Sequence, residues 1–475
     1  MSIGIDCKAQ TPFRLASPRA TDALQHRFGD RMSSAPSVLE QHAGLEGHHP
    51  LSLPEAVIFA ESRDDVVAVC RWCSENAVPL IAHGAGTSLE GHLSAVSGGI
   101  SLDLSRMNRI VSVETDNLLC VVEAGVTREQ LNSHLRDQGL FFPIDPGANA
   151  TLGGMAATRA SGTNAVRYGT MRENVLSLTV VLADGRVIET GTKAAKSAAG
   201  YDLTSLFVGS EGTLGIITQV MLRLRGIPAA IVAGTCAFDT LEGAVRTVVQ
   251  AIQIGLPVAR IELLDEHQVR ACNAYSKLDL PVMPTLFLEF HGPDAALDEQ
   301  SAVFAELAVE NGGGALRTAH HAEDRTALWK ARHNAYFATK ASKPDARVWT
   351  SDVCVPIASL AQSITDTRAL IDAAGLDATI VGHVGDGNYH VLFVMDPLKP
   401  EQWRGVEWVN DAMILQALKW GGTCSGEHGI GIGKRQKLLL ERGQDAVDVM
   451  RSMKATLDPL GILNPDKVIG SACPH

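Results

Sequence analysis

The segment His83-Gly84-Ala85-Gly86-Thr87-Ser88-Leu89-Glu90-Gly91-His92 decides the fold through its position in the chain. It follows an apolar strand predicted at 78–82, and a strand at 57–60 and a helix at 66–75 precede it, which together predict a β-α-β unit. It is not a dinucleotide G-x-G-x-x-G loop, because four residues separate Gly86 from Gly91, and no Lys follows as in a Walker loop. Small residues let successive backbone N–H groups bind an anion such as a diphosphate, although many loops of this kind are only tight turns.

Further loops rich in Gly and Ser strengthen the anion-binding interpretation. They fall at 145–148, 152–155, 160–164 and 209–215. The strands predicted between them, at 176–182 and 214–224, are apolar and β-branched. Several loops that expose backbone from one α+β domain indicate a long, flat ligand that carries phosphate. The pattern changes after Pro228, so we place a domain at 51–226, behind a polar, irregular N-terminal extension at 1–50.

The second half is predicted to form another α+β layer, followed by a helix at 447–457 that Pro and Gly stop. Strands are expected at 231–238, 258–264, 285–291, 315–318 and 348–355, with a hairpin around 379–394. Helices are expected at 241–254, 298–310, 324–339, 360–373 and 408–419. An antiparallel sheet with helices on one face is the simplest arrangement of these elements.

The composition excludes several classes of protein. At 475 residues we expect two or three domains, and a net charge of −12 offers no basic stripe to nucleic acid. No apolar run reaches the ~20 residues that span a bilayer, and Met1–Lys8 lacks the pattern of a secretory signal. Nine scattered cysteines fit reduced thiols, with Cys70 and Cys73 on a packed helix face, and no spacing fits an iron–sulfur cluster. We therefore expect a cytoplasmic protein, or one held peripherally at the inner membrane.

Two segments carry candidate metal ligands. Gly382-His383-Val384-Gly385-Asp386-Gly387-Asn388-Tyr389-His390 is predicted to be a hairpin with residues 385–388 as its loop, which would place His383 opposite His390. Two imidazoles on one face make half a metal site. Glu427 is a plausible third ligand, and the adjacent His428 points elsewhere and could act as a base. The alternative is a pair of surface or hydrogen-bonded histidines, and the pattern alone does not decide between the two.

Longer motifs carry a resemblance to a known family. They are residues 160–172 (ASGTNAVRYGTMR), 260–265 (RIELLD), 285–292 (TLFLEFHG), 328–335 (LWKARHNA), 351–356 (SDVCVP) and the two His/Glu segments. From about Pro54 to Val468 the chain resembles the FAD-linked D-2-hydroxyacid dehydrogenases of the vanillyl-alcohol-oxidase superfamily. Within that family it is most similar to the D-lactate dehydrogenases of the cytochrome or dye-linked type.

The resemblance implies an α+β fold with a two-subdomain FAD-binding domain of the PCMH/VAO type at 51–226. A ferredoxin-like α+β cap with an antiparallel sheet would cover 227–424, and residues 425–475 would return to the flavin side. FAD would be bound non-covalently, although some members of the superfamily attach flavin through a His, and His83 and His92 flank the loop. The implied cofactor-binding residues are His83, Gly84, Ala85, Gly86, Thr87, Ser88, Gly91, His92, Pro146, Gly147, Leu152, Gly153, Gly154, Ala160, Ser161, Gly162, Thr163, Tyr168, Gly169, Gly209, Glu211, Gly212, Gly215, Ile216, Ile217 and Asn464.

The resemblance also assigns roles in the reaction. His383, His390 and Glu427 would hold a divalent metal, Zn or Mn, and His428 would be the catalytic base. Arg332, Tyr336, Trp349 and Asn388 would contact the substrate, with Arg332 on its carboxylate. A metal-bound D-2-hydroxy acid would lose its hydroxyl proton to His428 and the hydride from its α-carbon to the flavin.

Two alternatives remain open at this stage. The substrate could be 2-hydroxyglutarate or glycolate, although residues 349–351 contain no Lys for a second carboxylate. A different class would be a non-catalytic flavin-binding subunit of a redox complex, which the metal trio and Arg332 disfavour. The electron acceptor could be a cytochrome, a quinone, an electron-transfer flavoprotein or oxygen, and a homodimer is one open arrangement.

Overall fold

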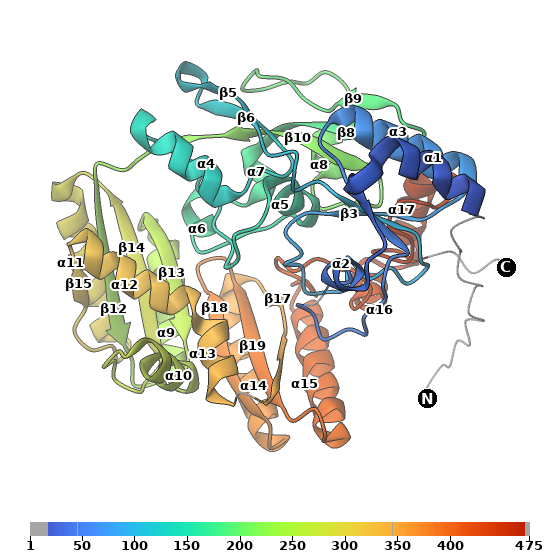
Figure 1. Cartoon of the computed structure of the whole chain (residues 1–475). Coiled ribbons are helices and arrows are strands. Elements are labelled where there is room, and N and C mark those ends of the chain that lie inside the picture. Colours follow the sequence, from blue (N-terminus) through green and yellow to red (C-terminus); the bar gives the residue numbers. More distant parts are fainter. Residues whose placement is uncertain (1–17, 45, 344, 471–475) are drawn as a thin grey trace.

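The computed structural model describes residues 18–44, 46–343 and 345–470 (Figure 1). The first half begins with a four-stranded sheet in the order β1-β2-β4-β3, in which β2 and β3 both run parallel to β4. These strands are β1 Met32–Ser33, β2 Ala56–Phe59, β3 Leu80–His83 and β4 Ile100–Asp103. Helix α3, Arg63–Asn76, connects β2 to β3, and the Ser62 side chain accepts from Asp65 N at its start. The predicted β-α-β unit is confirmed, with β4 inserted between its two strands.

Residues 18–41 of the N-terminal extension form helices and a short strand, so the prediction of an irregular segment at 1–50 is wrong there, whereas 42–44 and 46–50 contain neither. Residues 18–41 contain α1 Pro18–Phe28, a 3₁₀ turn at Gly29–Arg31, β1 and α2 Pro36–Gln41. Leu24 and Phe28, one helical turn apart, are buried in the same apolar cluster as α3 and the sheet. These two apolar side chains pack α1 against the first half, and Arg31 adds an ion pair to Asp65 of α3. Residues Met1–Lys8 lie outside the described part of the chain.

A five-stranded antiparallel sheet in the order β5-β6-β10-β8-β9 completes the first half. Its strands are β5 Ile110–Glu114, β6 Leu119–Glu123, β8 Val175–Val181, β9 Val187–Glu189 and β10 Ile216–Arg223. The helices beside it are α4 Arg128–Leu135, α5 Leu152–Thr158, α6 Ala165–Tyr168, α7 Met171–Asn174 and α8 Leu203–Phe207. The short strands β7, Leu140–Phe141, and β11, Arg225–Gly226, pair separately, and further 3₁₀ turns lie at Thr115–Asn117 and Arg136–Gln138.

An antiparallel sheet in the order β15-β12-β14-β13-β18-β19-β16 forms most of the second half, with β17 paired to β19. Its strands are β12 Ala230–Ala237, β13 Val258–Leu264, β14 Thr285–Gly292, β15 Arg317–Ala319, β16 Arg347–Thr350, β17 Val353–Cys354, β18 Asp377–His383 and β19 Asn388–Met395. We call it the eight-stranded sheet. The single strand predicted at 348–355 is therefore divided at Ser351 and Asp352, whose polar groups bond to the site described below.

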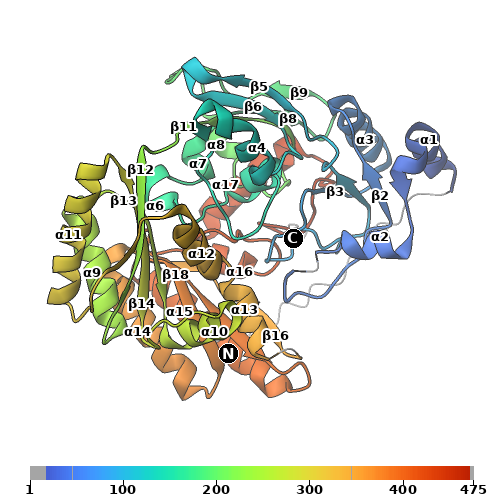
Figure 2. The same ribbon diagram turned by 60° about the vertical axis from the view of Figure 1, so that its left-hand side comes forward.

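Helices cover both faces of the eight-stranded sheet, so the prediction of one covered face is wrong (Figure 2). One face carries α9 Leu241–Gln253, α11 Asp294–Glu310, α14 Leu360–Ala373 and α15 Pro400–Lys419. The other carries α10 Glu266–Ser276, α12 Ala322–His333 and α13 Ala335–Ser342. In β14, Leu286 and Leu288 pack on the first face and Phe287 on the second. A strand buried on both faces is apolar at consecutive positions, which is the pattern of residues 285–290.

The end of the chain returns to the first half through α16 Arg435–Arg442 and α17 Gln444–Leu457 (Figure 1). Leu80 N donates to Ile462 O at 2.8 Å, and Asn464 N donates to Leu80 O at 2.8 Å, so this segment pairs with the edge strand β3. Among the described residues, none of the helices combines the length and apolar character that crossing a bilayer requires. Cys70 and Cys73 are free thiols buried on α3, as predicted.

Candidate active site

A cavity of about 680 Å³ lies between the glycine-rich loops of the first half and the eight-stranded sheet. The predicted cofactor residues that line it are His83, Gly84, Ala85, Gly86, Thr87, Ser88, His92, Pro146, Gly147, Gly153, Gly154, Ala160, Ser161, Thr163, Glu211, Gly212, Gly215, Ile217 and Asn464. The opposite wall contains Arg332, Tyr336, His383, His390, Glu427 and His428. Segments far apart in sequence therefore share one cavity, whose size is usual for a cofactor site.

The remaining predicted cofactor residues lie outside the cavity lining. They are Gly91, Leu152, Gly162, Tyr168, Gly169, Gly209 and Ile216. Several of them support the loops from behind: Leu152 and Ile216 are fully buried core residues, and the Tyr168 hydroxyl lies 2.7 Å from His291 Nδ1. A Cβ on Gly162 would lie 2.5 Å from the backbone of Asp145, so this glycine permits two loops to touch.

The residues on the first wall fit an FAD molecule. A Cβ on Gly84 would lie 2.3 Å from Thr151 Oγ1, so the loop needs glycine there to approach its neighbour. Asn464 Oδ1 and both ring nitrogens of His83 are buried without a hydrogen-bond partner among the described residues. Buried polar atoms in native proteins are normally satisfied, and a polar ligand in this cavity would satisfy those that face it.

The hairpin pairs its strands in a register that differs by two residues from the predicted one, because its loop begins one residue earlier. His383 lies opposite Asn388, and His390 lies opposite Val381, so the loop is 384–387 instead of 385–388. Asp386 N donates to His383 O, and Gly387 adopts φ +80°, where an added Cβ would lie 2.1 Å from Val355 O. The two histidines remain on one face as a diagonal pair, with ring centroids 5.4 Å apart.

Glu427 completes a cluster with both histidines. Its Oε1 lies 3.2 Å from His383 Nε2 and 3.2 Å from His390 Nε2. Burial alone would raise the pKa of the Glu427 carboxyl, but the two histidines hold it well below its usual range. Two imidazoles and a charged carboxylate that converge from the wall of a cavity are a donor set that fits a divalent metal.

The other ring nitrogen of each histidine is already engaged. His383 Nδ1 lies 2.8 Å from Glu262 Oε1, and His390 Nδ1 lies 3.0 Å from Ser351 O. An acceptor at Nδ1 fixes the proton there and leaves the Nε2 lone pair directed at the centre of the cluster. Sequence reasoning missed Glu262, although a charge at alternate positions of the buried strand β13 was an available signal.

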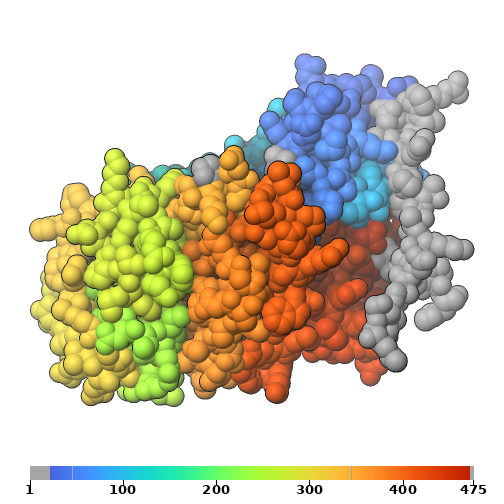
Figure 3. Space-filling model, turned by 90° about the horizontal axis from the view of Figure 1, so that it is seen from below, coloured from blue at the N-terminus to red at the C-terminus, as the bar shows by residue number. Residues whose placement is uncertain are grey.

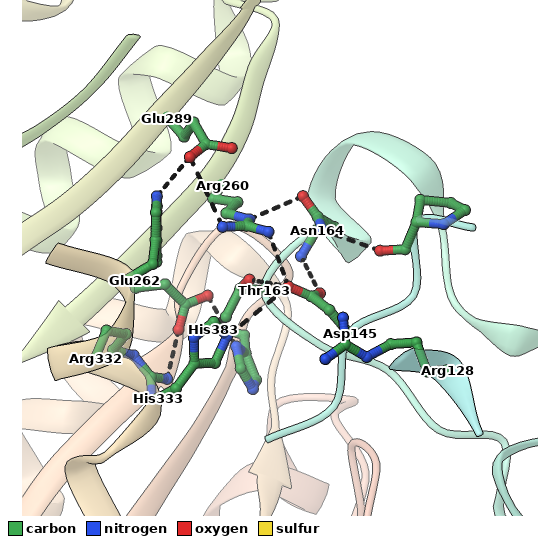
Figure 4. Close-up of polar contacts among 12 residues, drawn as sticks. Arg128, Asp145, Thr163, Asn164, Arg260, Glu262, Glu289, Arg332, His333 and His383 are labelled. Atoms are coloured by element: carbon green, nitrogen blue, oxygen red, sulfur yellow. Dashed lines mark hydrogen bonds and ion pairs between the residues drawn. The ribbon is translucent and has the colours of Figure 1, made fainter. Parts of the chain in front are cut away.

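Glu262 also binds Arg332 (Figure 4). Arg332 Nη2 lies 2.5 Å from Glu262 Oε2, and both side chains are almost completely buried. Arg332 Nε is buried without a hydrogen-bond partner among the described residues. Arg332 therefore has one edge fixed by Glu262 and keeps a donor for an anion in the cavity.

The loop that carries Glu427 and His428 is held from both halves of the molecule. Asp352 Oδ2 accepts from Glu427 N at 3.1 Å and from His428 N at 2.9 Å. Glu211, on the opposite wall, accepts from the backbone N–H groups of Ile430 and Gly431. Two buried carboxylates thus fix this loop across the cavity.

His428 lies beside the cluster without joining it. Its ring stacks on that of His390 with centroids 4.9 Å apart, and its Nδ1 is buried without a described partner. Burial lowers the pKa of His428 to about 4, while Asp352 opposes this effect and His390 adds to it. The ring is therefore neutral at pH 7 and able to accept a proton.

The predicted substrate residues divide into two groups. Arg332 and Tyr336 line the cavity, whereas Trp349 and Asn388 do not. Asn388 Nδ2 donates to Asp352 Oδ1 at 2.8 Å behind the cluster. Trp349 points to a second cavity of about 470 Å³ and stacks on His48 with centroids 3.7 Å apart. Figure 3 shows this side of the molecule, where the blue N-terminal part lies against the orange part of the chain.

An ion network joins the two halves next to the cavity (Figure 4). Arg260 Nε donates to Asn164 Oδ1 at 2.9 Å, and its Nη2 donates to Asp145 Oδ2 at 3.1 Å. Arg260 Nη1 lies 3.7 Å from Glu289 on the neighbouring strand. Asn164 and Asp145 belong to the glycine-rich loops, so Arg260 fixes the eight-stranded sheet against them.

Comparison with solved structures identifies the class of fold. The structure matches 4-ethylphenol oxidase from Gulosibacter chungangensis with a TM-score of 0.79 over 97% of this chain and 98% of that one, at 19% identity. It matches p-cresol methylhydroxylase with a TM-score of 0.77 over 95% and 96% of the two chains, at 17% identity. The fold is thus the FAD-binding fold of the PCMH/VAO type, as the resemblance implied.

Sequence comparison identifies the family. Residues 54–191 match the FAD binding domain, and residues 227–468 match the C-terminal domain of FAD linked oxidases. The chain belongs to the FAD-linked oxidase family. It is similar to a probable mitochondrial D-lactate dehydrogenase of Danio rerio, 47% identical over 96% of this chain and 92% of the relative. The mitochondrial D-lactate dehydrogenase [cytochrome] of Arabidopsis thaliana is 43% identical over 89% of this chain and 74% of its own.

Proposed function

We propose that this FAD-linked oxidase oxidises a D-2-hydroxy acid, with D-lactate as the substrate and pyruvate as the product, and passes the electrons to an external acceptor. The observation that carries the proposal is the pair of unpartnered buried nitrogens on one cavity wall, Arg332 Nε and His428 Nδ1. One is a fixed cationic donor and the other belongs to a neutral imidazole, and a hydroxy acid needs both.

Each residue on this wall has a distinct role in the proposal. Arg332 binds the substrate carboxylate through its free edge. His428 takes the hydroxyl proton as the hydride leaves the α-carbon. FAD, when bound, supplies the acceptor for that hydride. His383, His390 and Glu427 would hold a divalent metal, Zn or Mn, which would lower the pKa of a bound hydroxyl.

The charges of the cavity favour a monocarboxylate over 2-hydroxyglutarate. Among the described residues that line it, Arg332 is the only Arg or Lys, and Glu46 adds a negative charge. The neighbouring wall contains the apolar side chains of Val381 and Leu392. A second carboxylate would therefore have no cation of its own. The names of the relatives support D-lactate and a cytochrome-type acceptor.

The test is a screen of D- and L-2-hydroxy acids with an artificial dye as acceptor, using the FAD-loaded protein. D-lactate should reduce the dye with the highest kcat/KM, and 2-hydroxyglutarate should be at least tenfold poorer. Arg332→Lys retains the charge but loses the planar fork, so it should raise KM for D-lactate by roughly 10-fold or more. Equal activity with L-lactate, or an unchanged KM in Arg332→Lys, would contradict the proposal.

A further inference from the structure

A second cluster of His and carboxylate lies at the loop 83–92, which we call the dinucleotide loop because it is expected to bind FAD, and only its His83 lines the cavity described above. It consists of His42, directly after α2, His83 at the end of β3 and Asp103 at the end of β4. All three are buried, with 5–7% of each residue exposed. One possible ligand atom from each of the three residues lies within 4.8 Å of those from the other two.

Two polar atoms that face away from the centre of this cluster already have hydrogen-bond partners. His42 Nδ1 lies 2.7 Å from Val38 O, and Asp103 Oδ1 accepts from Ser105 N at 2.7 Å. The carbonyl fixes the proton of His42 on Nδ1, so in the neutral ring Nε2 directs a lone pair at Asp103 Oδ2, 3.0 Å away. Two lone pairs at that distance repel each other unless a proton or a metal ion lies between them. Burial lowers the pKa of His42, but the contacts with Asp103 and Val38 raise it above its usual value.

His83 provides an independent observation. Both of its ring nitrogens are buried and have no hydrogen-bond partner among the described residues. Its Nδ1 lies 3.8 Å from Asp103 Oδ2, which is too long for a hydrogen bond. Two ligands of a tetrahedral zinc ion, each 2.0–2.1 Å from it, lie about 3.3 Å apart. The separations of 3.0 and 3.8 Å bracket this value.

We propose that His42, His83 and Asp103 bind a divalent transition-metal ion of the zinc type, a site separate from the one at His383, His390 and Glu427. The ion would join the N-terminal segment, through His42, to two strands whose ends support the dinucleotide loop. Its role is structural, because three segments of the chain converge on it and all three ligand residues are buried.

The experiment measures the zinc bound per chain by mass spectrometry in FAD-loaded protein grown with zinc and then desalted. The variants are His83→Phe, which keeps a ring of similar size, Asp103→Asn, and Glu427→Gln, which disrupts the other cluster. His83→Phe should lose one equivalent and Glu427→Gln should retain the ion at the new site. Circular dichroism reports folding in each variant, and bound flavin reports it in Asp103→Asn and Glu427→Gln, whose side chains do not lie on the cavity wall that fits FAD.

The outcomes separate the two clusters. If the wild type holds one zinc that Glu427→Gln removes and His83→Phe retains, the proposal is overturned. If the wild type holds one zinc ion that His83→Phe removes, the new site is supported and the proposal of a metal ion at Glu427 is contradicted. As a second measurement, Glu427→Gln protein loaded with Co²⁺ should show the visible absorption of a tetrahedral ion, which His83→Phe should abolish. An unchanged zinc content in both His83→Phe and Asp103→Asn would mean that His42 and Asp103 form only an ion pair.

Discussion

The two clusters of His and carboxylate use the same donor types but differ in their access to the cavity. In the first cluster, His383 and His390 lie on the hairpin, and Glu427 comes from a loop 44 residues after His383. All three line the cavity. Under the dinucleotide loop only His83 reaches the cavity lining, and His42 and Asp103 lie behind it. A metal with an open position can act on a substrate, whereas an enclosed one holds segments of chain together. Access to the cavity, more than the types of donor atom, therefore distinguishes the roles proposed for the two clusters.

The largest effect is expected for Glu427→Gln. It removes the charge that both histidines face and should lower kcat with D-lactate on the order of 10³-fold or more, because several kcal/mol of transition-state stabilisation are lost. Steady-state turnover with a dye acceptor measures it, and bound FAD should remain. Full activity in this variant, shown to be metal-free, would remove the functional contrast between the clusters.

His428→Ala should be the next most damaging change. The loss of a positioned base should cut the rate of flavin reduction by about 10²–10⁴-fold. Substrate affinity should change little, because Arg332 and the cluster are intact. Stopped-flow reduction over a range of D-lactate concentrations separates the limiting rate from the half-saturation value. A change in half-saturation alone would make His428 a binding residue.

Glu262→Gln should have an intermediate effect that sharpens the comparison. The variant keeps the shape of the side chain but weakens the acceptor that fixes the proton of His383, and such changes typically cost about 10–100-fold in metal affinity or activity. Glu289→Gln is the matched control, a buried carboxylate on the adjacent strand whose partners are His291, Trp329 and Arg260. Equal losses in both variants would mean that Glu262 acts only through the stability of the sheet.

The smallest effect on activity is expected for the cluster of His42, His83 and Asp103. There the two clusters should differ in the rate at which a bound metal ion is released. A chromogenic chelator should remove the ion near Glu427 rapidly, together with activity, and the ion near Asp103 slowly, because release needs local opening. Zinc release followed with time should show two phases, and His83→Phe should lack the slow one. A single fast phase with two equivalents would show that burial does not distinguish the sites.

The sequence was sufficient to predict that His383, His390 and Glu427 lie together, but not the register of the hairpin. A loop with Gly-Asp-Gly can close at 384–387 or at 385–388, and only the contact of Gly387 with Val355 selects the first. The alternating charges of β13 could have drawn attention to Glu262, but its partner His383 lies 121 residues later in the chain and could not be found from local pattern. Trp349 was expected at the substrate, but strand alternation directs it away from the cavity that Thr350 lines.

The pairing of β3 with residues 462–464 has a consequence for synthesis on the ribosome. Leu80 obtains two of its backbone hydrogen bonds from the last tenth of the chain, and Lys454 Nζ bonds to Thr213 O and Leu463 O. The edge strand β3 therefore stays incomplete until residues 462–464 have been synthesised and have left the ribosome. Until then the first half should lack part of its final stability and of its affinity for flavin, and the nascent chain presents an open strand edge that neighbouring chains could pair with.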